Sequence, residues 1–269
     1  MKIISSTENQ IYKKVFRLGA KKYRDKTGLY IIEGPNLIGE ALNQAETLKT
    51  VIFKKSLILE NVNNEKNELK NKLENKGIEI YAINDKIFDN LSDTQTTQGV
   101  LGIVKKPLYD EKKFFLSRIK SNGNIIVLDR LQDPGNIGTI IRTADGAGYQ
   151  GALILKGTAD IFSPKIVRAA AGSIFRLPML IIDSPEQAIN LLKNNNKKVI
   201  CTALKDAKNY YECDMSRNVA VIIGNEGNGV CEEFIKNSDI NVKIPMKSTI
   251  ESLNAAVAAG ILIYESVRK

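Results

Sequence analysis

Polar side chains with catalytic potential gather in short segments of the second half of the chain. The first segment, residues 129–138, reads Asp-Arg-Leu-Gln-Asp-Pro-Gly-Asn-Ile-Gly and precedes a helical segment that carries Arg142. It follows an apolar stretch, and ligands of parallel sheets bind beyond the carboxyl ends of the strands. The segment lacks the glycine and lysine pattern of phosphate loops and the glycine pattern of dinucleotide folds. A tight turn with Arg142 in a surface ion pair remains the alternative.

A glycine-rich loop forms the second segment, which also follows an apolar run. Residues 222–229 read Ile-Ile-Gly-Asn-Glu-Gly-Asn-Gly. Glycine lets the backbone approach a ligand closely or adopt a positive φ. A mobile turn remains the alternative interpretation of this loop. Glu226 lies between glycines, where a carboxylate contributes little to local stability, so it is less easily explained as a solvated charge.

The third segment joins an apolar run to the last helix. Residues 244–254 read Ile-Pro-Met-Lys-Ser-Thr-Ile-Glu-Ser-Leu-Asn, and residues 255–260 are rich in Ala and Gly. Ser and Asn at such an entry are common helix caps. Ser252 and Asn254 need not both cap one helix, however, so one or both remain candidates for hydrogen bonding to a substrate.

Some chemistry is excluded by the composition. The chain has no histidine, which removes the commonest general base and metal ligand. Its three cysteines lack C-x-x-C spacing, so neither a disulfide framework nor a zinc site is indicated. We therefore expect no metal and a reducing, cytoplasmic location. The N-terminus does not resemble a signal peptide, and the longest apolar stretch, 255–264, is too short to span a bilayer.

Basic residues cluster near the N-terminus. Residues 7–24 have the periodicity of one amphipathic helix, with Ile11, Val15 and Leu18 on its apolar face. The formal net charge of the chain is +9, which makes a polyanionic partner plausible. A solvated helix face is the alternative. The candidate RNA-contacting residues are Lys13, Lys14, Arg17, Lys21, Lys22 and Arg24.

Alternating strands and helices predict two α/β domains joined by a polar linker at 107–123. In residues 1–106 the predicted strands are 29–32, 51–53, 78–83 and 100–104, with helices at 35–45 and 61–76. In residues 124–269 the apolar strands favour a parallel sheet with helical crossovers. Its predicted strands are 125–128, 152–155, 180–182, 199–204, 219–223 and 242–244, and its predicted helices are 138–147, 164–172, 185–194, 231–236 and 253–267.

Together and in this order, the three segments resemble the motifs of the SpoU (TrmH) family of RNA ribose methyltransferases in the SPOUT superfamily. Residues 136–144 correspond to motif one, 223–229 to motif two, and 244–246 with 252–258 to motif three. The resemblance runs from about residue 121 onwards. Residues 33–35 and 40–42 also resemble the small ribosomal-protein-like RNA-binding domain of the 23S rRNA branch, although this match is less specific.

The resemblance implies a deep trefoil knot in the C-terminal α/β domain, with S-adenosylmethionine held in it largely by main-chain groups. Such a knot would not be expected from pattern alone, since knots are very rare. Carried over by motif position, the cofactor-binding residues are Thr202, Leu204, Gly224, Ile244, Met246 and Leu253. Family members are homodimers, often with a site completed across the interface, which implies a homodimer here.

The implied reaction is methyl transfer to a ribose 2′-hydroxyl, with Asn136, Arg142, Glu226, Ser252 and Asn254 as the catalytic set. A guanidinium stays protonated, so we expect Arg142 to orient the RNA and stabilise the developing alkoxide rather than act as base. Asn136 would orient Arg142 or the substrate, and Glu226 would fix the arginine or the loop.

Large-subunit rRNA is the expected substrate, because the simpler tRNA enzymes of the family generally lack the preceding domain. A tRNA ribose methyltransferase and a non-catalytic RNA-binding assembly factor remain alternatives, and an antibiotic-resistance role is compatible with the reading. A nicotinamide-dependent dehydrogenase is disfavoured by the missing histidine and glycine motif.

Overall fold

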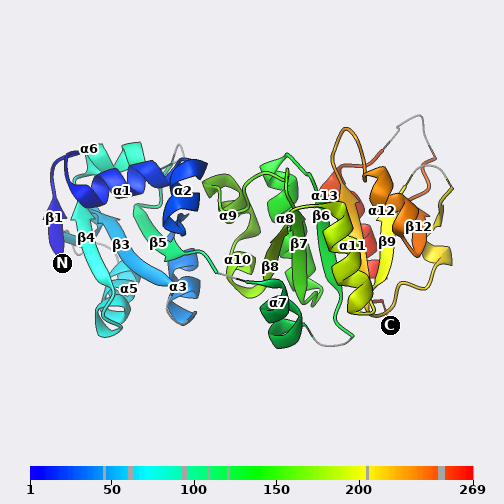
Figure 1. Ribbon diagram of the computed structural model, residues 1–269. Helices are drawn as coiled ribbons and strands as arrows, with labels where there is room; N and C mark the ends of the chain where they lie inside the picture. The colour runs from blue at the N-terminus through cyan, green and yellow to red at the C-terminus, as the bar shows by residue number, and fades with distance from the viewer. Residues whose placement is uncertain are drawn as a thin grey trace. The chain divides into compact units, whose positions relative to one another are not determined.

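The computed structural model describes residues 1–44, 47–59, 64–92, 96–107, 109–119, 122–203, 206–247 and 252–268. The chain forms two compact units, which are described separately (Figure 1). Unit 1 comprises Met1–Pro107 with Phe162–Phe175, and unit 2 comprises Leu108–Ile161 with Arg176–Lys269. The return of residues 162–175 to unit 1 was not predicted from the sequence.

Unit 1 is built on a mixed five-stranded sheet in the order β1-β4-β3-β5-β2. β1, β4 and β3 run parallel, and β5 is antiparallel to both β3 and β2. The predicted strands are all present, and β1 is an addition. Their bounds are β1 Lys2–Ile4, β2 Leu29–Glu33, β3 Leu48–Lys54, β4 Glu79–Ile83 and β5 Val100–Lys105.

Helices cover both faces of this sheet. α1 packs Tyr12, Val15 and Leu18 on one face, whereas α3 and α5 pack against strands β2 to β5 on the other. The helices of unit 1 are α1 Gln10–Leu18, α2 Lys21–Thr27, α3 Pro35–Asn43, α4 Lys55–Leu59, α5 Asn64–Asn75, α6 Asp85–Phe88, the 3-10 turn η1 Asp89–Leu91, and α9 Pro164–Ala170. The short α10, Ser173–Arg176, ends one residue past this unit.

The single helix predicted for residues 7–24 is wrong, because two helices occupy the segment. α1 is capped by the Asn9 side chain, which accepts a hydrogen bond from the N–H of Ile11 at 2.8 Å. It ends at Leu18 with Gly19 as its C-cap, and Ala20 adopts an extended conformation before α2 begins. Ile11, Val15 and Leu18, which gave the apolar periodicity, all lie within α1, so the pattern did not mark where this helix ends.

Unit 2 contains a seven-stranded sheet in which every pairing is parallel, and this confirms the predicted parallel α/β architecture. The order is β10-β12-β9-β11-β6-β7-β8. The trefoil knot stays an expectation from the family resemblance. The strands are β6 Ile125–Asp129, β7 Gly151–Leu155, β8 Met179–Ile182, β9 Lys198–Thr202, β10 Lys208–Asn209, β11 Val219–Gly224 and β12 Ile240–Lys243.

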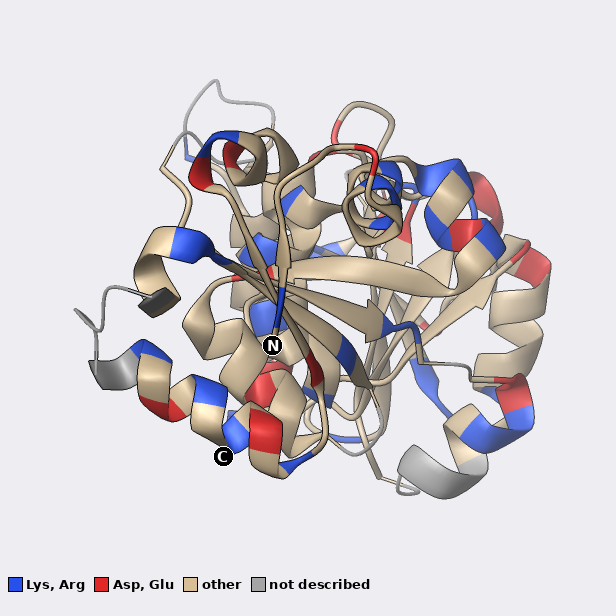
Figure 2. Cartoon of the chain, turned by 90° about the vertical axis from the view of Figure 1, so that its left-hand side faces the viewer, with Lys and Arg blue, Asp and Glu red and all other residues tan. Residues whose placement is uncertain are grey.

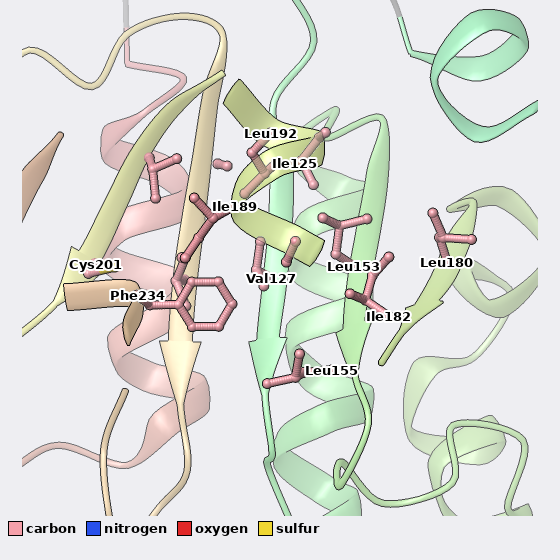
Figure 3. Close-up of a cluster of buried hydrophobic side chains, with 14 of the residues drawn as sticks. Ile125, Val127, Leu153, Leu155, Leu180, Ile182, Ile189, Leu192, Cys201 and Phe234 are labelled. Atoms are coloured by element: carbon pink, nitrogen blue, oxygen red, sulfur yellow. The ribbon is translucent and has the colours of Figure 1, made fainter. Parts of the chain in front are cut away.

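Two helical layers enclose the sheet of unit 2. Figure 3 shows strand side chains such as Val127 and Leu153 facing Ile189 of α11 and Phe234 of α12. α8 and α13 lie on the opposite face and pack against each other. The helices of unit 2 are α7 Glu111–Arg118, α8 Pro134–Gly146, α11 Pro185–Asn194, α12 Glu232–Asn237 and α13 Ala255–Glu265, with the 3-10 turn η2 Tyr210–Glu212.

The polar linker predicted for 107–123 is in part a structured element. α7 begins after Asp110, whose side chain accepts a hydrogen bond from the N–H of Lys113 at 2.7 Å. Phe114 and Phe115 are buried in the core of unit 2. The abundance of charged residues around these two aromatic side chains concealed a helix that contributes to the core.

Candidate active site

The predicted site residues at strand ends gather along one edge of the unit 2 sheet. β12, β9, β11 and β6 are consecutive neighbours. Val242 pairs with Thr202, and Gly224 pairs with Asp129. Since these parallel strands end at the same edge, the loops that carry the three motif segments emerge side by side.

Glu226 joins the glycine loop to the start of α8. Its two carboxylate oxygens accept hydrogen bonds from the N–H groups of Gln132 and Asp133, both at 3.0 Å. Asn136 Nδ2 donates a third bond, at 3.2 Å. The N–H groups come from the turn before α8, where the helix dipole also favours negative charge. The carboxylate therefore fixes the loop of motif one relative to that of motif two.

The same contacts set the charge state of Glu226. Desolvation is the largest single effect and would by itself raise the pKa, but the N–H groups of Gln132 and Asp133 and the Asn136 amide together outweigh it, with the result that the pKa of Glu226 lies below its ordinary value. Glu226 is therefore an anion at neutral pH and acts as a hydrogen-bond acceptor there. Nothing in this arrangement makes it a proton donor.

Asn254 connects the third segment to the first. Its Nδ2 donates to Asn136 Oδ1 at 2.8 Å. Its Oδ1 caps α13 by accepting from the N–H groups of Ala256 at 2.9 Å and Val257 at 3.3 Å. The two ends of one amide thus have different roles: the oxygen caps α13, and the nitrogen contacts Asn136. A continuous chain of side chains, Glu226–Asn136–Asn254, links all three motif segments.

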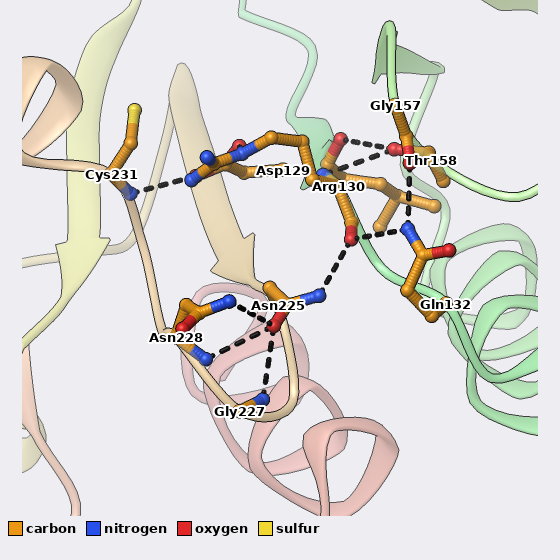
Figure 4. Close-up of polar contacts among 10 residues, drawn as sticks. Asp129, Arg130, Gln132, Gly157, Thr158, Asn225, Gly227, Asn228 and Cys231 are labelled. Atoms are coloured by element: carbon orange, nitrogen blue, oxygen red, sulfur yellow. Dashed lines mark hydrogen bonds and ion pairs between the residues drawn. The ribbon is translucent and has the colours of Figure 1, made fainter.

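Asn225 and Gly224 shape the glycine loop. Asn225 Oδ1 accepts from the N–H groups of Gly227 and Asn228, both at 3.0 Å, and its Nδ2 donates to the carbonyl of Arg130 at 2.9 Å (Figure 4). A Cβ added to Gly224 would lie 2.1 Å from the nitrogen of Val230. Only glycine permits the loop to fold back on the end of β11.

Asp129 is a site-forming residue that the motif reading missed. Its fully buried carboxylate accepts from Arg130 Nε at 2.7 Å and from the N–H of Cys231 at 2.8 Å (Figure 4). Arg130 holds a positive φ of 60°. Asp129 thereby ties the loop after β6 to the segment after the glycine loop. The sequence signal that could have revealed Asp129 is an acidic residue at the end of an apolar strand.

Arg142 and Ser252 are not brought into this hydrogen-bonded chain. Arg142 lies on α8 six positions after Asn136, which places it about 120° around the helix. It is exposed and has no hydrogen bond or ion pair within the described part of the chain. Within one chain, then, Glu226 and Asn136 fix the loops rather than the arginine. Ser252 is also exposed, just before Leu253.

The predicted cofactor-binding residues fit an uncharged ring system. Thr202 and Gly224 end adjacent strands, while Ile244, Met246 and Leu253 are half-buried in the connections around α13. Apolar side chains beside irregular backbone offer flat contact together with main-chain hydrogen bonds, which is what the adenine of S-adenosylmethionine requires. Leu204 lies outside the described residues.

The basic candidates of α1 and α2 divide into free and engaged side chains. Lys14, Arg17, Lys21 and Lys22 make no hydrogen bond or ion pair with any described residue, and Lys13 pairs with Glu8. Figure 2 shows Lys and Arg positions interspersed with acidic ones over several elements. The unpaired cations of α1 and α2 therefore indicate a polyanion contact better than the total charge does.

Arg24 is a correction to the predicted RNA-contacting set. It is only 3% exposed. Its guanidinium donates to the carbonyls of Leu18 at 2.8 Å and Gly19 at 2.7 Å. It therefore satisfies the carbonyl groups at the end of α1 and stabilises the helix break.

Two further searches concern only the residues that the structure describes. Among them, no helix combines the length and apolar character needed to cross a membrane. Within the same part of the chain, no cluster of three or more His, Cys, Asp or Glu side chains is arranged to hold a metal ion.

Comparisons with known proteins agree with the three motif segments. Residues 123–264 match the model of the SpoU rRNA Methylase family, and residues 9–102 match that of an MRM3-like substrate binding domain. The chain is 36% identical to 23S rRNA (guanosine(2553)-2′-O)-methyltransferase RlmP of Bacillus subtilis (strain 168), over 98% of each protein. The resemblance predicted from the motifs is confirmed.

Solved structures extend the likeness to the fold of both units. An AdoMet-bound rRNA methyltransferase from Sinorhizobium meliloti has a TM-score of 0.87 at 30% identity, covering 98% of this chain and 97% of that one. The SpoU methyltransferase AviRb from Streptomyces viridochromogenes, in complex with AdoMet, has a TM-score of 0.86 at 26% identity, covering 97% of each chain.

Proposed function

This chain belongs to the SpoU rRNA methylase family, and from that premise we propose that it methylates a ribose 2′-hydroxyl of 23S ribosomal RNA. The protein is an RNA 2′-O-methyltransferase that uses S-adenosylmethionine. The relative from Bacillus subtilis, which matches over its full length, supports large-subunit RNA as the substrate. A cytoplasmic location follows from that substrate.

One observation carries the catalytic assignment, namely the hydrogen-bonded chain Glu226–Asn136–Asn254. It draws three segments distant in sequence to the carboxyl edge of a parallel sheet. Each member is polar and fixed by a second contact, so the site is preorganised before RNA binds. A stable core does not require such a chain, since apolar packing would hold the same loops.

The roles of the site residues follow from their chemistry. When bound, S-adenosylmethionine supplies a methyl group activated by a positively charged sulfur. Thr202, Gly224, Ile244, Met246 and Leu253 would hold it, with Leu204 as a further candidate. The ribose hydroxyl is a weak nucleophile, so charge developing on its oxygen must be stabilised. The positive charge of Arg142 stabilises the developing negative charge and holds the adjacent phosphate, and Ser252 hydrogen-bonds the acceptor ribose.

A homodimer through α8 and α13 is part of the proposal. α13 is apolar on nearly every side, yet Val257 and Tyr264 are 53% and 56% exposed in the single chain. A helix of this kind is normally covered on all sides. Arg142 lies exposed on α8, which packs against α13. A second copy on this face would bury the apolar residues and could bring its site to Arg142.

The domain roles complete the proposal. Residues 124–269 form the methyltransferase domain, residues 107–123 connect it to the rest, and residues 1–106 bind RNA. The match of residues 9–102 to a substrate binding domain supports the last assignment. So do the free side chains of Lys14, Arg17, Lys21 and Lys22.

Methyl transfer from labelled S-adenosylmethionine to separated, unmodified 23S rRNA and tRNA tests the proposal. A 2′-O-methyl group makes the adjacent phosphodiester resistant to alkali, which locates the product. We expect label in 23S rRNA at such a linkage, and none with Arg142→Ala. Label in tRNA alone would replace the substrate assignment and keep the chemistry.

If neither RNA is labelled, precursor particles of the large ribosomal subunit are tested as the substrate. If these also remain unlabelled while calorimetry shows S-adenosylmethionine binding, a non-catalytic assembly factor replaces the enzyme. Arg142→Lys tests the role of the arginine, because lysine keeps the charge but not the two-pronged geometry. Full turnover with lysine would rule out the proposed positioning role.

A further inference from the structure

Unit 1 contains a cavity of about 270 Å³ that the catalytic proposal does not use. Val15, Ile31 and Leu101 form apolar walls of the cavity, and Phe16 of α1 is a further lining residue. Pockets for drug-sized ligands usually exceed ~300 Å³. The volume therefore suits one planar ring system better than a whole cofactor.

Polar groups line another part of the cavity. Glu33 is only 9% exposed, and its Oε1 accepts from the hydroxyls of Ser92 and Thr97, both at 2.8 Å. The guanidinium of Arg168 lies 4.0 Å from Glu33 Oε2. Asn90 and Ser92 also line the cavity. Donors and acceptors thus lie beside apolar walls, which is the pattern that reads the edge of a flat polar ring.

Phe16 is the largest apolar side chain left open on α1. It is 63% exposed and carries one parallel neighbour, Tyr12, with ring centroids 6.4 Å apart. Arg17 follows it directly, and Lys13 lies one helical turn before it. An exposed aromatic ring among cations is the arrangement with which proteins stack the bases of single-stranded nucleic acids.

We propose that this cavity receives one unpaired nucleobase of the substrate RNA, stacked against Phe16, with its polar edge toward Asn90 and Ser92. The free cations Lys14 and Arg17 contact the phosphates that flank this base. The inference rests on the proposed function, because it names a feature of the RNA that the enzyme methylates. It adds a contact outside the reaction site, made by unit 1.

Charge complementarity decides in favour of RNA over an apolar peptide. An apolar segment would fill the walls, yet would leave Lys14, Arg17, Lys21 and Lys22 without counterions. A double helix does not fit either, because its bases are stacked inside and their polar edges are paired. The cavity therefore selects loops, bulges or ends in which a base is already exposed.

A tryptophan reporter tests the stacking directly. The chain has no tryptophan, so Phe16→Trp introduces a single one that keeps a large ring at this position. We expect a mixed-sequence single-stranded RNA oligonucleotide to quench its fluorescence and the same strand in a perfect duplex to leave it unchanged at equal binding. Equal quenching by the single strand and the duplex, or no quenching by either, would overturn the proposal.

Binding and kinetics with unlabelled variants provide the second test. Loss of one stacking partner in Phe16→Ala should raise the Kd for single-stranded RNA about 10-fold without changing its salt dependence. Arg17→Ala should instead weaken binding and reduce the slope of log K against log salt by about one. Ile3→Ala removes an exposed apolar side chain of the same unit outside the cavity and should change neither.

Methyl transfer to 23S rRNA separates this inference from the proposed function. Phe16→Ala should raise KM and leave kcat near the wild-type value, and Phe16→Tyr should restore KM. If wild type methylates rRNA but Phe16→Ala has an unchanged KM and Kd, the cavity inference fails and the function stands. If wild type methylates no RNA while the fluorescence of the Phe16→Trp variant responds to single strands, the function fails and the base site stands.

Discussion

Glu226 shows how much of the site depends on one carboxylate. It accepts three hydrogen bonds on two oxygens, whereas a glutamine amide replaces one acceptor with a donor. We expect Glu226→Gln to lower kcat/KM for rRNA methylation by up to about 100-fold, because misplaced loops misalign the reacting groups. Single-turnover methyl transfer measures this effect. Glu233→Gln is the matched control, because Glu233 is an exposed glutamate on α12. Unchanged rates with Glu226→Gln would show that its acceptors are dispensable.

Lys197 is a second residue whose charge matters, in this case for stability. It is buried at the start of β9, and its Nζ donates to the carbonyl of Gly123 at 2.7 Å and to Asn218 Oδ1 at 2.6 Å. Both of these acceptors are neutral. Desolvation lowers the pKa of Lys197 from 10.5 to about 8. The folded state therefore gives up this proton more readily than the unfolded state does.

The sign of the resulting pH dependence follows from proton counts. Between pH 8 and 10.5 the unfolded chain binds more of the lysine proton than the folded chain, so this group makes the free energy of unfolding rise with pH there. We expect urea midpoints to increase from pH 7.5 to 9.5 in wild type, and less so in Lys197→Met. Lys193→Met, on the exposed side of α11, should keep the wild-type slope. Parallel profiles for wild type and Lys197→Met would refute the assignment.

At the scale of elements, the C-terminal end of α13 is tied to the sheet by a buried polar cluster. Ser266 Oγ contacts the hydroxyl of Tyr149 at 2.8 Å and donates to the carbonyl of Ile263 at 2.7 Å. Asn124 Nδ2 donates to Ser266 Oγ at 3.4 Å, and its Oδ1 accepts from the N–H of Val219 at 3.1 Å. The cluster thus links α13 to the starts of β6 and β11.

Removing the central hydroxyl should loosen this tie. Ser266→Ala leaves the buried Tyr149 hydroxyl short of a partner, at a cost of about 1–3 kcal/mol in the free energy of unfolding. Urea denaturation measures the change, and Ser5→Ala, at an exposed position whose side chain makes no hydrogen bond with the described residues, should be neutral. Tyr149→Phe should cost less in the Ser266→Ala background than in wild type, because the two hydroxyls share one bond. Strictly additive effects would contradict the cluster.

Elements with local start signals could be predicted from the sequence, and others could not. α11 has the predicted bounds because Ser184 caps it and Pro185 suits its first position. The break between α1 and α2 was missed because the apolar residues that predicted the helix all lie within α1 and do not mark its end. α7 was missed because its role depends on Phe114 packing against Gly151, a contact distant in sequence. Local propensity is visible in a sequence, while tertiary burial is not.

The same difference between local signals and tertiary contacts applies to the candidate site. Motif order placed Asn136, Glu226 and Asn254 in one candidate site, and the structure links their side chains by hydrogen bonds. The same reading did not reveal that Arg24 is buried against α1 or that Asp129 holds two loops together. A buried charged residue with neutral or distant partners produces no periodic pattern in the sequence. Its structural role can therefore be recognised only from the three-dimensional structure.

At the scale of the whole molecule, the position of Arg142 calls for a second copy. The arginine has no partner among the described residues of its own chain, and it lies exposed on α8, which packs against α13, a helix that itself exposes Val257 and Tyr264. In a twofold dimer each such face meets its equivalent. We therefore expect Arg142 to serve the site of the partner subunit.

Subunit mixing distinguishes this arrangement from a site within one chain. Arg142→Ala and Asn254→Asp should each be inactive alone, and the aspartate keeps the oxygen that caps α13. If Arg142 acts across the dimer, a mixed dimer holds one intact site and one doubly altered site. An equal mixture after subunit exchange should then recover about a quarter of wild-type methyl transfer. Adding Val257→Glu and Tyr264→Glu to both chains should yield monomers by light scattering and abolish the recovery. Mixed dimers that form but stay inactive would place Arg142 in the site of its own chain.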